Sequence, residues 1–515
     1  MPSIKRQKKT QKKIQKKIQN KTQKKTQNKQ PGSNNNNNNK QNVKIKLNVI
    51  RNKYGGCLSF GGESKNVNKL FGFTSNNNNF NDISIINKIG KTSSNGFVYK
   101  IDYTKDDYNF SAVLKSSSSP ESDNLFYEYF VGMNFINKVN LFFPCFVETY
   151  KLFFNTSPEL YRKMKRNIPF HNDLLLRYML PYRIDNLSSK IYCKKSQYLS
   201  ILIQTVPNSQ SLGDYINVNI NVLLNEQKFN KMKQIEIEMT NKNKIIHEDT
   251  KNQKTWLEWL RWVKPSNELI LIKKNYKTIV LNKVEMELIQ FFYQVYTPLC
   301  YLKDKFTHYD LHQDNVLLYR LEDNKYITMR YIYPDQTVIE FNTSAIIKII
   351  DYGRSFFVSN TSDRRGPVEF QETILSEQEC NDGVQIEGDR SGFHYLTSDS
   401  SNSNYIEPLR NNPSHDLRLI KSIKDDFRAR CVTSCFDDLF KSLLFENHYG
   451  TPSYQSKGDE IGDVTVVEVY LRKKIQNDNF KNIQTTIFSN PNFIKMGTLN
   501  IYLGKDKNME YIPIL

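Results

Sequence analysis

Hydrophobic residues recur along this 515-residue chain with both strand and helix spacing. Residues 82–100 predict a strand, a glycine-containing turn and a second strand, and Tyr198–Val206 is an apolar run of strand length. Residues 120–138 and 283–305 instead carry apolar side chains at intervals of three and four, which is the spacing of an amphipathic helix. The mixture predicts an α+β fold.

The second half of the chain continues this mixture. Residues 320–344 alternate around a central Pro-Asp pair and predict a β-hairpin, and Ile346–Ile350 is an apolar run that predicts a buried strand. Short runs at 464–471 and 499–503 also favour strands, while residues 414–420 favour the start of a helix.

A low-complexity tail carries most of the net charge. Residues 1–53 contain 17 Lys and Arg and no Asp or Glu, whereas the whole chain has 73 basic and 53 acidic residues and a formal net charge of +20. Setting those 17 aside leaves 56 basic against 53 acidic residues, so the remainder is nearly neutral. Residues 1–48 are expected to be disordered, because they hold too few apolar side chains to offset chain entropy. They are either a solvated tail or a nucleic-acid contact that neutralises phosphates.

Cysteine usage and hydropathy favour a cytoplasmic protein without a membrane segment. The seven cysteines are scattered and form no C-x-x-C pair, which indicates reduced thiols. No apolar stretch approaches the roughly 18 residues of a membrane helix, and the N-terminus has no hydrophobic signal core.

Two short motifs carry the candidate chemistry. His308 to Asn315 has the form H-x-D-x-x-x-x-N and precedes an apolar run, and Asp351-Tyr352-Gly353 follows another apolar run. An acid and an amide on one short loop, with a second acid at a strand end, suit phosphoryl transfer. Asp310 would accept the proton of an acceptor hydroxyl, while Asn315 and Asp351 would hold Mg²⁺ on the nucleotide phosphates.

Upstream segments complete a familiar order of parts. Residues 89–100 read as strand, glycine turn and strand, and Ala112-Val113-Leu114-Lys115 places a lysine at the end of an apolar strand. The order is glycine turn, lysine, acidic helix, H-x-D loop and Asp-Tyr-Gly. It resembles the protein-kinase superfamily from about residue 84 to at least residue 430. The Asn- and Lys-rich style resembles kinase-like proteins of giant DNA viruses.

This resemblance implies a two-lobed, kinase-like fold with large insertions and a disordered basic N-terminal tail. The parts it implies are a tail at 1–48, a flank at 49–83, a small lobe at 84–206, and a large lobe at 207–515 with insertions near 217–282, 319–345 and 357–412.

The resemblance also implies roles for individual residues. Asp310 would be the general base, and Lys115 would bridge two nucleotide phosphates while pairing with Glu128, with Glu121 as the alternative partner. His312 stands two positions after the base and could contact the γ-phosphate. The further nucleotide contacts implied, with Lys115, are Ile89, Gly90, Gly96, Val98, Ala112, Ile203, Gln204, Val206 and Leu317. Asp416, near the start of a helix, resembles the aspartate that anchors the catalytic loop.

The sequence departs from the family pattern at several points. The glycine turn lacks its middle glycine, protein kinases commonly carry lysine where His312 stands, and no Ala-Pro-Glu follows Asp351. Asp310-Leu311-His312 also resembles small-molecule kinases of the aminoglycoside and choline type. A stripe of Trp256, Trp259 and Trp262 lies in the first insertion, and it packs on its own domain or docks a partner.

These features predict an ATP- and Mg²⁺-dependent phosphotransferase, a serine/threonine protein kinase with a protein substrate. One alternative is a small-molecule kinase. The other is a catalytically weak pseudokinase scaffold that binds protein or nucleic-acid partners. The expected compartment is the cytoplasm, that of the host cell for a viral protein, with the virion or nucleus as alternatives. The sequence does not predict an oligomeric state.

Overall fold

The structure is a computed structural model. It describes residues 82–90, 96–105, 108–117, 125–181, 199–219, 267–358, 384–385, 393–396, 403–406, 411–429, 462–504 and 507–513, together with residues 67, 80 and 439. The tail at 1–48, nearly all of the flank at 49–83, the glycine-turn residues 91–95, Glu121 and the three tryptophans lie outside the described residues. The predictions made for them stay predictions.

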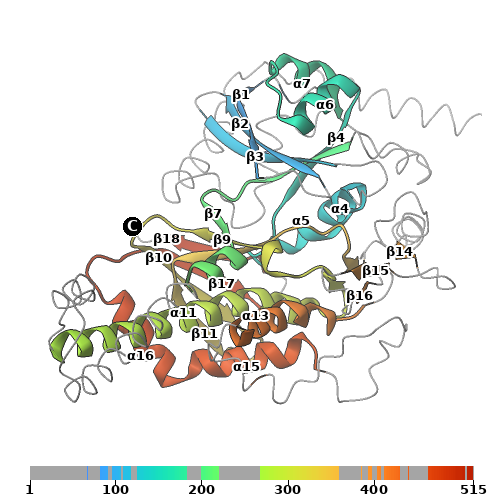
Figure 1. Ribbon diagram of the computed structural model, residues 1–515. Helices are drawn as coiled ribbons and strands as arrows, with labels where there is room; N and C mark the ends of the chain where they lie inside the picture. Colours follow the sequence, from blue (N-terminus) through green and yellow to red (C-terminus); the bar gives the residue numbers. More distant parts are fainter. Residues whose placement is uncertain are drawn as a thin grey trace, which may run out of the picture. The chain divides into compact units, whose positions relative to one another are not determined.

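The N-terminal part is a six-stranded antiparallel sheet with the strand order β1-β2-β3-β6-β4-β5 (Figure 1). Buried and half-buried residues alternate along β2, because successive side chains of a strand point to opposite faces. The predicted strands at 82–100 and 198–206 are confirmed as β1, β2 and β6. The strands are β1 (Ile83–Ile89), β2 (Phe97–Lys105), β3 (Tyr108–Ser116), β4 (Thr149–Asn155), β5 (Met179–Pro181) and β6 (Leu199–Gln204).

Helices α6 (Pro158–Arg166) and α7 (Asp173–Tyr178) connect β4 to β5. Ser157 caps α6 by accepting a hydrogen bond from the Leu160 amide, and Pro158 stands in the first turn, where its missing N–H costs nothing. The sequence analysis did not anticipate these two helices.

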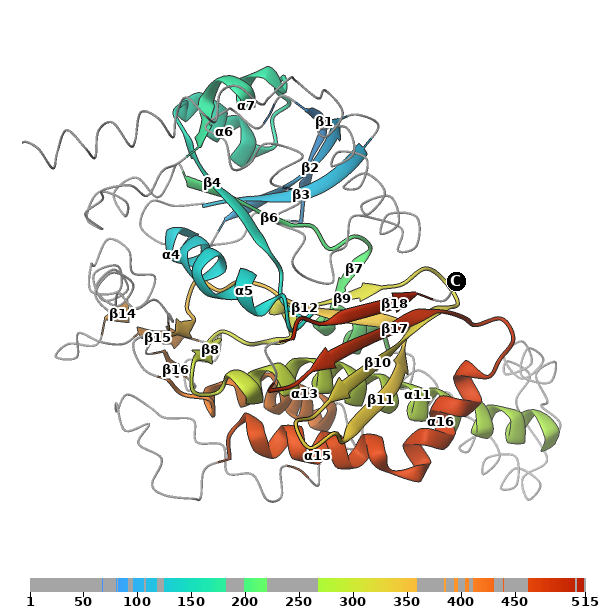
Figure 2. The same cartoon turned by 180° about the vertical axis from the view of Figure 1, so that it is seen from behind.

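The helical stretch predicted at 120–138 is confirmed over α4 (Leu125–Val131), a π-helical turn at Gly132–Ile136 and α5 (Asn137–Val139). It packs against β4 and β6 (Figures 1 and 2). The Asn137 side-chain amide donates to the Thr149 carbonyl at 2.7 Å and accepts from the Thr149 amide at 2.9 Å. This pair of bonds fixes the helix to the first residue of β4.

The long helix of the second half is α11 (Asn267–Leu302), which contains Pro298. The prediction of a helix at 283–305 is confirmed, and the helix also includes residues 267–282, which the sequence analysis placed in the first insertion. Neither glycine nor proline occurs between 267 and 297, so nothing stops helix propagation there.

The hairpin predicted at 320–344 is confirmed as β10 (Lys325–Ile332) and β11 (Val338–Thr343). It belongs to a four-stranded sheet with the order β11-β10-β17-β18, in which β17 (Ile494–Tyr502) pairs parallel to β10 and β18 (Glu510–Pro513) closes the edge. The strand predicted at 499–503 is therefore confirmed in β17.

The strand predicted at 464–471 is wrong, because these residues begin helix α15 (Val464–Gln476). The β-branched residues there favoured a strand, but Asp463 caps the helix at the Thr465 amide, and buried side chains recur at Val467, Leu471 and Ile475. Helical periodicity prevailed over local strand preference. Helices α15 and α16 (Asp478–Phe488) pack along α11.

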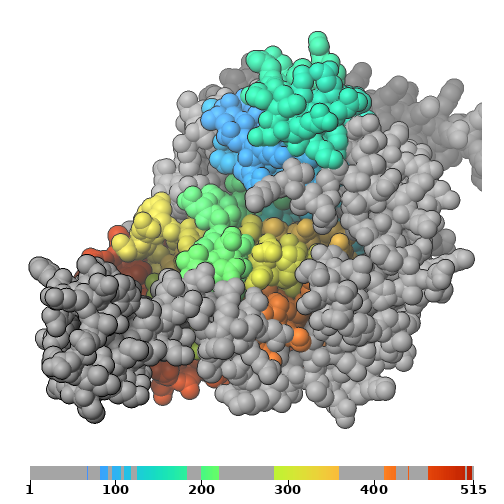
Figure 3. Space-filling model, viewed as in Figure 1, coloured from blue at the N-terminus to red at the C-terminus, as the bar shows by residue number. Residues whose placement is uncertain are grey.

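Short strands near the middle of the chain position the candidate chemistry. A three-stranded sheet has the order β12-β9-β7, with β12 (Ala345–Ile349), β9 (Val316–Arg320) and β7 (Ser209–Ser211). A two-stranded sheet joins β13 (Phe356–Phe357) to β8 (Phe306–Thr307). In the space-filling view, residues of the β7 region (green) adjoin those of the β9–β12 region (yellow) (Figure 3).

Three further strands and a helix complete the described elements. Strands β14 (Val384–Gln385), β15 (Phe393–Leu396) and β16 (Ser403–Ile406) form a small antiparallel sheet within the insertion predicted at 357–412. The helix start predicted at 414–420 is confirmed by a 3₁₀ turn at His415–Leu417 and helix α13 (Arg418–Ala429). Among the described residues, no helix is both long and apolar enough to cross a membrane.

We predict that Gly132→Ala destabilises the protein. A Cβ at this position would lie 2.1 Å from the Thr149 hydroxyl oxygen and 2.7 Å from its Cβ, and Thr149 is buried. Overpacking of this kind costs about 1–3 kcal/mol, more than the helix propensity that alanine adds. The midpoint of denaturant unfolding should fall, whereas Lys138→Ala, at an exposed site of the same helical stretch, should leave it nearly unchanged. Equal midpoints for the two variants would contradict this packing.

Candidate active site

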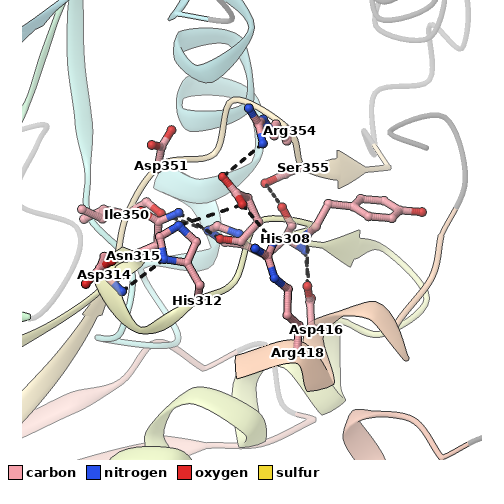
Figure 4. Close-up of polar contacts among 12 residues, drawn as sticks. His308, His312, Asp314, Asn315, Ile350, Asp351, Arg354, Ser355, Asp416 and Arg418 are labelled. Carbon is pink, nitrogen blue, oxygen red and sulfur yellow. Dashed lines mark hydrogen bonds and ion pairs between the residues drawn. The ribbon is translucent and has the colours of Figure 1, made fainter. Parts of the chain in front are cut away.

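The H-x-D loop is held by hydrogen bonds from two sides (Figure 4). The Asp416 carboxylate accepts the backbone N–H groups of His308 at 2.9 Å and Tyr309 at 3.0 Å. On the other side, His308 Nε2 lies 3.0 Å from the Ile350 carbonyl, and the Ser355 hydroxyl donates to the His308 carbonyl at 3.2 Å. The loop therefore has the aspartate anchor that the sequence predicts, and it is tied to the segment around Asp351.

Two residues of this region have left-handed backbone conformations. Tyr309 has φ of 63° and Asp351 has φ of 68°. Neither is glycine, so each conformation costs free energy that surrounding contacts must offset, a situation that is common at functional sites. The amide of Tyr309 is held by Asp416, and the side chain of Asp351 is held by Lys115.

Lys115 joins three segments that are distant in sequence. Its ammonium nitrogen lies 2.6 Å from a carboxylate oxygen of Glu128 on α4 and 3.0 Å from a carboxylate oxygen of Asp351 after β12. Glu128 is the partner that the sequence analysis selected. The side chains of Lys115 and Glu128 are 17% and 5% exposed, so the pair lies in a poorly solvated position, where charges interact strongly.

Lys115 and Asp351 stabilise each other's charged forms. Burial acts to lower the pKa of Lys115, but Asp351 and Glu128 outweigh it and hold that pKa above its usual value. Burial acts to raise the pKa of Asp351, but Lys115 and then Arg354 hold it below the usual range. The Asp351 carboxyl is therefore ionised at neutral pH, as a ligand for a divalent cation must be.

Asn315 is part of the same loop as Asp310. Its side-chain nitrogen donates to the Asp310 carbonyl at 2.9 Å, which fixes the direction of the amide. Asn315 ends a 3₁₀ turn at Gln313–Asn315, and the His312 ring accepts from the Asp314 amide at the start of that turn. The Ile350 amide donates to the Asn315 carbonyl at 3.0 Å, so the residue before Asp351 is bonded to the loop that carries Asp310, His312 and Asn315.

The carboxylate of Asp310 lies between two arginines that the sequence analysis did not include in the site. Arg418 Nη1 lies 3.2 Å from Asp310 Oδ1, and Arg354 Nη1 lies 3.6 Å from Asp310 Oδ2. His312 Nε2 is farther, at 4.0 Å from Oδ1. Arg354 directly follows Asp-Tyr-Gly and Arg418 follows Asp416 by two residues, but neither position alone predicts a contact with Asp310.

The predicted nucleotide contacts divide between the two faces of the N-terminal sheet. Direct pairing places Ile89, Val98 and Lys115 in one row across β1, β2 and β3, so these three share a face. Ile203 pairs with Val113, which also lies on the Lys115 face. Gly90, which follows Ile89, has a left-handed φ of 68°. At Gly96 there is no room for a Cβ, because that atom would lie 2.4 Å from the Ser116 carbonyl oxygen.

One of the predicted contacts needs correction, and a second is restricted. Ala112 is three residues before Lys115, so strand alternation turns it to the opposite face, where it is fully buried; Val113 stands on the Lys115 face instead. The N–H of Gln204 donates to the Glu148 carbonyl at 2.8 Å, so this N–H is not available to a ligand, and any other backbone contact of Gln204 with a nucleotide stays a prediction. Contacts of Val206 and Leu317 with a nucleotide stay predictions.

Ser355 and Phe357, shortly after Asp351, pack against the helical stretch that begins with α4. The Tyr127 hydroxyl on α4 donates to the Ser355 carbonyl at 2.6 Å, and the Phe357 ring meets those of Tyr127, Phe130 and Phe135. This contact couples α4, which carries Glu128, to the position of Asp351.

Comparison with known proteins adds no relative, since no protein-family model matches the chain and no curated protein has a similar sequence.

We predict that Asp416→Ala loosens the H-x-D loop. The change leaves two buried backbone N–H groups without their acceptor, at a cost of about 1–3 kcal/mol for each. The free energy of unfolding should fall by about 2–6 kcal/mol, and amide hydrogen exchange at residues 308–310 should accelerate. Asp304→Ala, which removes an exposed carboxylate shortly before the loop, serves as the control. Unchanged exchange in Asp416→Ala would refute the anchor.

Proposed function

We propose that this chain is an ATP- and Mg²⁺-dependent phosphotransferase that modifies serine or threonine hydroxyls of a protein, on a two-lobed fold of the protein-kinase type. The observation that carries the proposal is the position of Lys115, within 3.0 Å of Glu128 and Asp351, beside a loop that presents Asp310 and Asn315. A lysine, two oxygen ligands and a separate carboxylate are the groups that phosphoryl transfer requires.

Each group would have a defined task. Lys115, held by Glu128, would bind the nucleotide phosphates, and Asp310 would orient the acceptor hydroxyl and receive its proton. Asn315 and Asp351 offer the hard oxygen ligands that Mg²⁺ prefers. Among the described residues, no group of three His, Cys, Asp or Glu side chains is arranged to hold a metal, so nucleotide oxygens would complete the ligand set. When bound, Mg²⁺ would neutralise negative charge on the nucleotide phosphates.

A small-molecule kinase is the second candidate. His312 near Asp310 favours it, because protein kinases commonly have lysine there. The pseudokinase alternative is weaker, because Lys115, Asp310, Asn315 and Asp351 are all present in the sequence. Transfer of labelled phosphate from ATP onto separate protein and metabolite pools distinguishes the three.

Contact of the basic tail with nucleic acid, action in the cytoplasm and kinship with viral kinase-like proteins stay proposals. If the chain binds nucleic acid through its tail, this binding should weaken as salt rises, because it depends on counterion release. Loss of the binding after deletion of residues 1–48 would support the tail contact.

We predict that Asp310→Ala lowers turnover about 10²–10⁴-fold, the usual contribution of a positioned proton acceptor. Binding of ATP with Mg²⁺ should persist, because Lys115 and Asp351 are unchanged. Asp351→Ala should instead abolish Mg²⁺-dependent nucleotide binding. Phosphate transfer and nucleotide binding are measured on the same preparations, with Asp323→Ala, an exposed turn residue, as the control. Full activity in Asp310→Ala would rule out its assignment as the base.

A further inference from the structure

Strand β11 forms one edge of the four-stranded sheet, so one of its sides has no neighbouring strand in the part of the chain that the structure describes. At the hairpin end, the Tyr333 amide donates to the Thr337 carbonyl at 2.9 Å, and the bonds between antiparallel strands recur at every second residue. Phe341 therefore bonds to β10, whereas the N–H and C=O groups of Glu340 and Asn342 point away from it.

Part of this edge already holds an amide group. The side chain of Gln484, on α16, accepts a hydrogen bond from the Asn342 amide at 2.8 Å and donates to the Asn342 carbonyl at 2.9 Å. These are the two bonds that a residue of an adjacent antiparallel strand would make. Two residues earlier, the N–H and C=O groups of Glu340 point in the same direction, and no described residue bonds to either of them. An unpaired peptide group thus lies next to one that an amide has completed.

A cavity of about 400 Å³ adjoins this unpaired group. It opens between β11 and α16, which pack against each other (Figure 2). The rings of Phe341 on the strand and of Phe480 and Phe488 on the helix line it, together with the exposed side chain of Thr485. The site therefore combines backbone donors and acceptors with aromatic surface.

We infer that this edge binds an extended segment of another protein, which adds a strand beside β11. An extended chain repeats an N–H and a C=O at the spacing of the edge. Side chains alternate along such a strand, so the residue opposite Glu340 lies on the side of that carboxylate, and its two neighbours point to the Phe341 side, toward the cavity. The segment that fits has a cation opposite Glu340 and an apolar residue on each side of it. Arg330 approaches Glu340 from β10 at 2.8 Å, and the added cation would approach from the opposite side.

A second copy of this chain fits the edge less well. Two β11 strands paired about Glu340 would place two carboxylates directly opposite each other, and like charges in that position destabilise a sheet. Strand β11 contains no proline, and its pairing with β10 has no bulge, so two common means of blocking an edge are missing from it. The edge is therefore open to a segment of different sequence.

The test measures binding of synthetic peptides to the full chain by titration calorimetry, without ATP, so its outcome does not depend on the proposed function. The probe has Lys at its centre, Leu on each side of it and Thr at both ends. A copy with methylated nitrogens at the three central residues keeps the side chains but loses the N–H donors. It should bind about tenfold more weakly or worse, the effect of one or two net hydrogen bonds. A copy with Glu at the centre should also bind more weakly, because it opposes Glu340.

Variants then assign the binding to this edge. E340P removes the outward N–H without removing a bond to β10, a position where proline is tolerated, and should weaken binding of the probe about tenfold. E340Q keeps the N–H and should reduce the preference for Lys over Glu at the centre of the peptide.

A second pair of variants does not alter the strand. T485W places a large ring at the cavity and should weaken binding of the probe about tenfold, because its Leu side chains then lack room. The matched control is T486W, the next residue of α16, which is also exposed but does not line the cavity. Each threonine hydroxyl donates to the carbonyl four residues earlier, so both changes remove the same kind of bond.

Several outcomes would overturn the inference. Absence of binding at millimolar probe concentration would do so, and so would equal binding of the probe and its methylated copy. Equal affinities of T485W and T486W for the probe would separate the binding from the cavity. Self-association of the chain that T485W abolishes, without binding of any peptide, would assign the edge to a second copy instead.

Discussion

The arrangement of the candidate site depends on one partly buried cation, the ammonium group of Lys115. A charge in a poorly solvated position is costly unless it is paired, and removal of one partner from such a pair is strongly destabilising. Lys115 is paired twice, with Glu128 on α4 and with Asp351 after β12. The N-terminal sheet, α4 and the strand before Asp351 must therefore keep these relative positions for the charge to remain compensated.

Other contacts limit the movement of the same three segments. Asn137 fixes the helical stretch of α4 to β4, and the Tyr127 hydroxyl ties α4 to Ser355, four residues after Asp351. Asp416 holds the H-x-D loop, which His308 and Ser355 tie in turn to the same segment. The left-handed conformations of Tyr309 and Asp351 are thus maintained by contacts on both sides, as expected where the backbone is pre-organised for a ligand.

The sequence predicted best those features that are encoded locally. Asp310 and Asn315 lie on one loop, Glu128 lies in the middle of a predicted helix, and the family resemblance indicated Asp416, so the contacts of Glu128 and Asp416 agree with expectation. Ala112 lies on the face opposite Lys115, because it is three residues earlier in the same strand and side chains alternate along a strand. Residues 464–471 were misjudged because β-branched side chains also occur in helices that pack well. Arg354 and Arg418 could not be found, since only the tertiary fold brings α13 to Asp310.

We propose that Lys115, Asn315 and Asp351 form a site for a nucleotide together with Mg²⁺. The most direct test is the thermal unfolding of the full chain with ATP, with Mg²⁺, and with both. A ligand that binds only the native state at a hundredfold excess over its Kd adds about 2.7 kcal/mol of stability. We expect a stabilisation that requires both components and grows with ATP concentration. Absence of any shift at saturating ATP with Mg²⁺, or an equal shift without the metal, would contradict it.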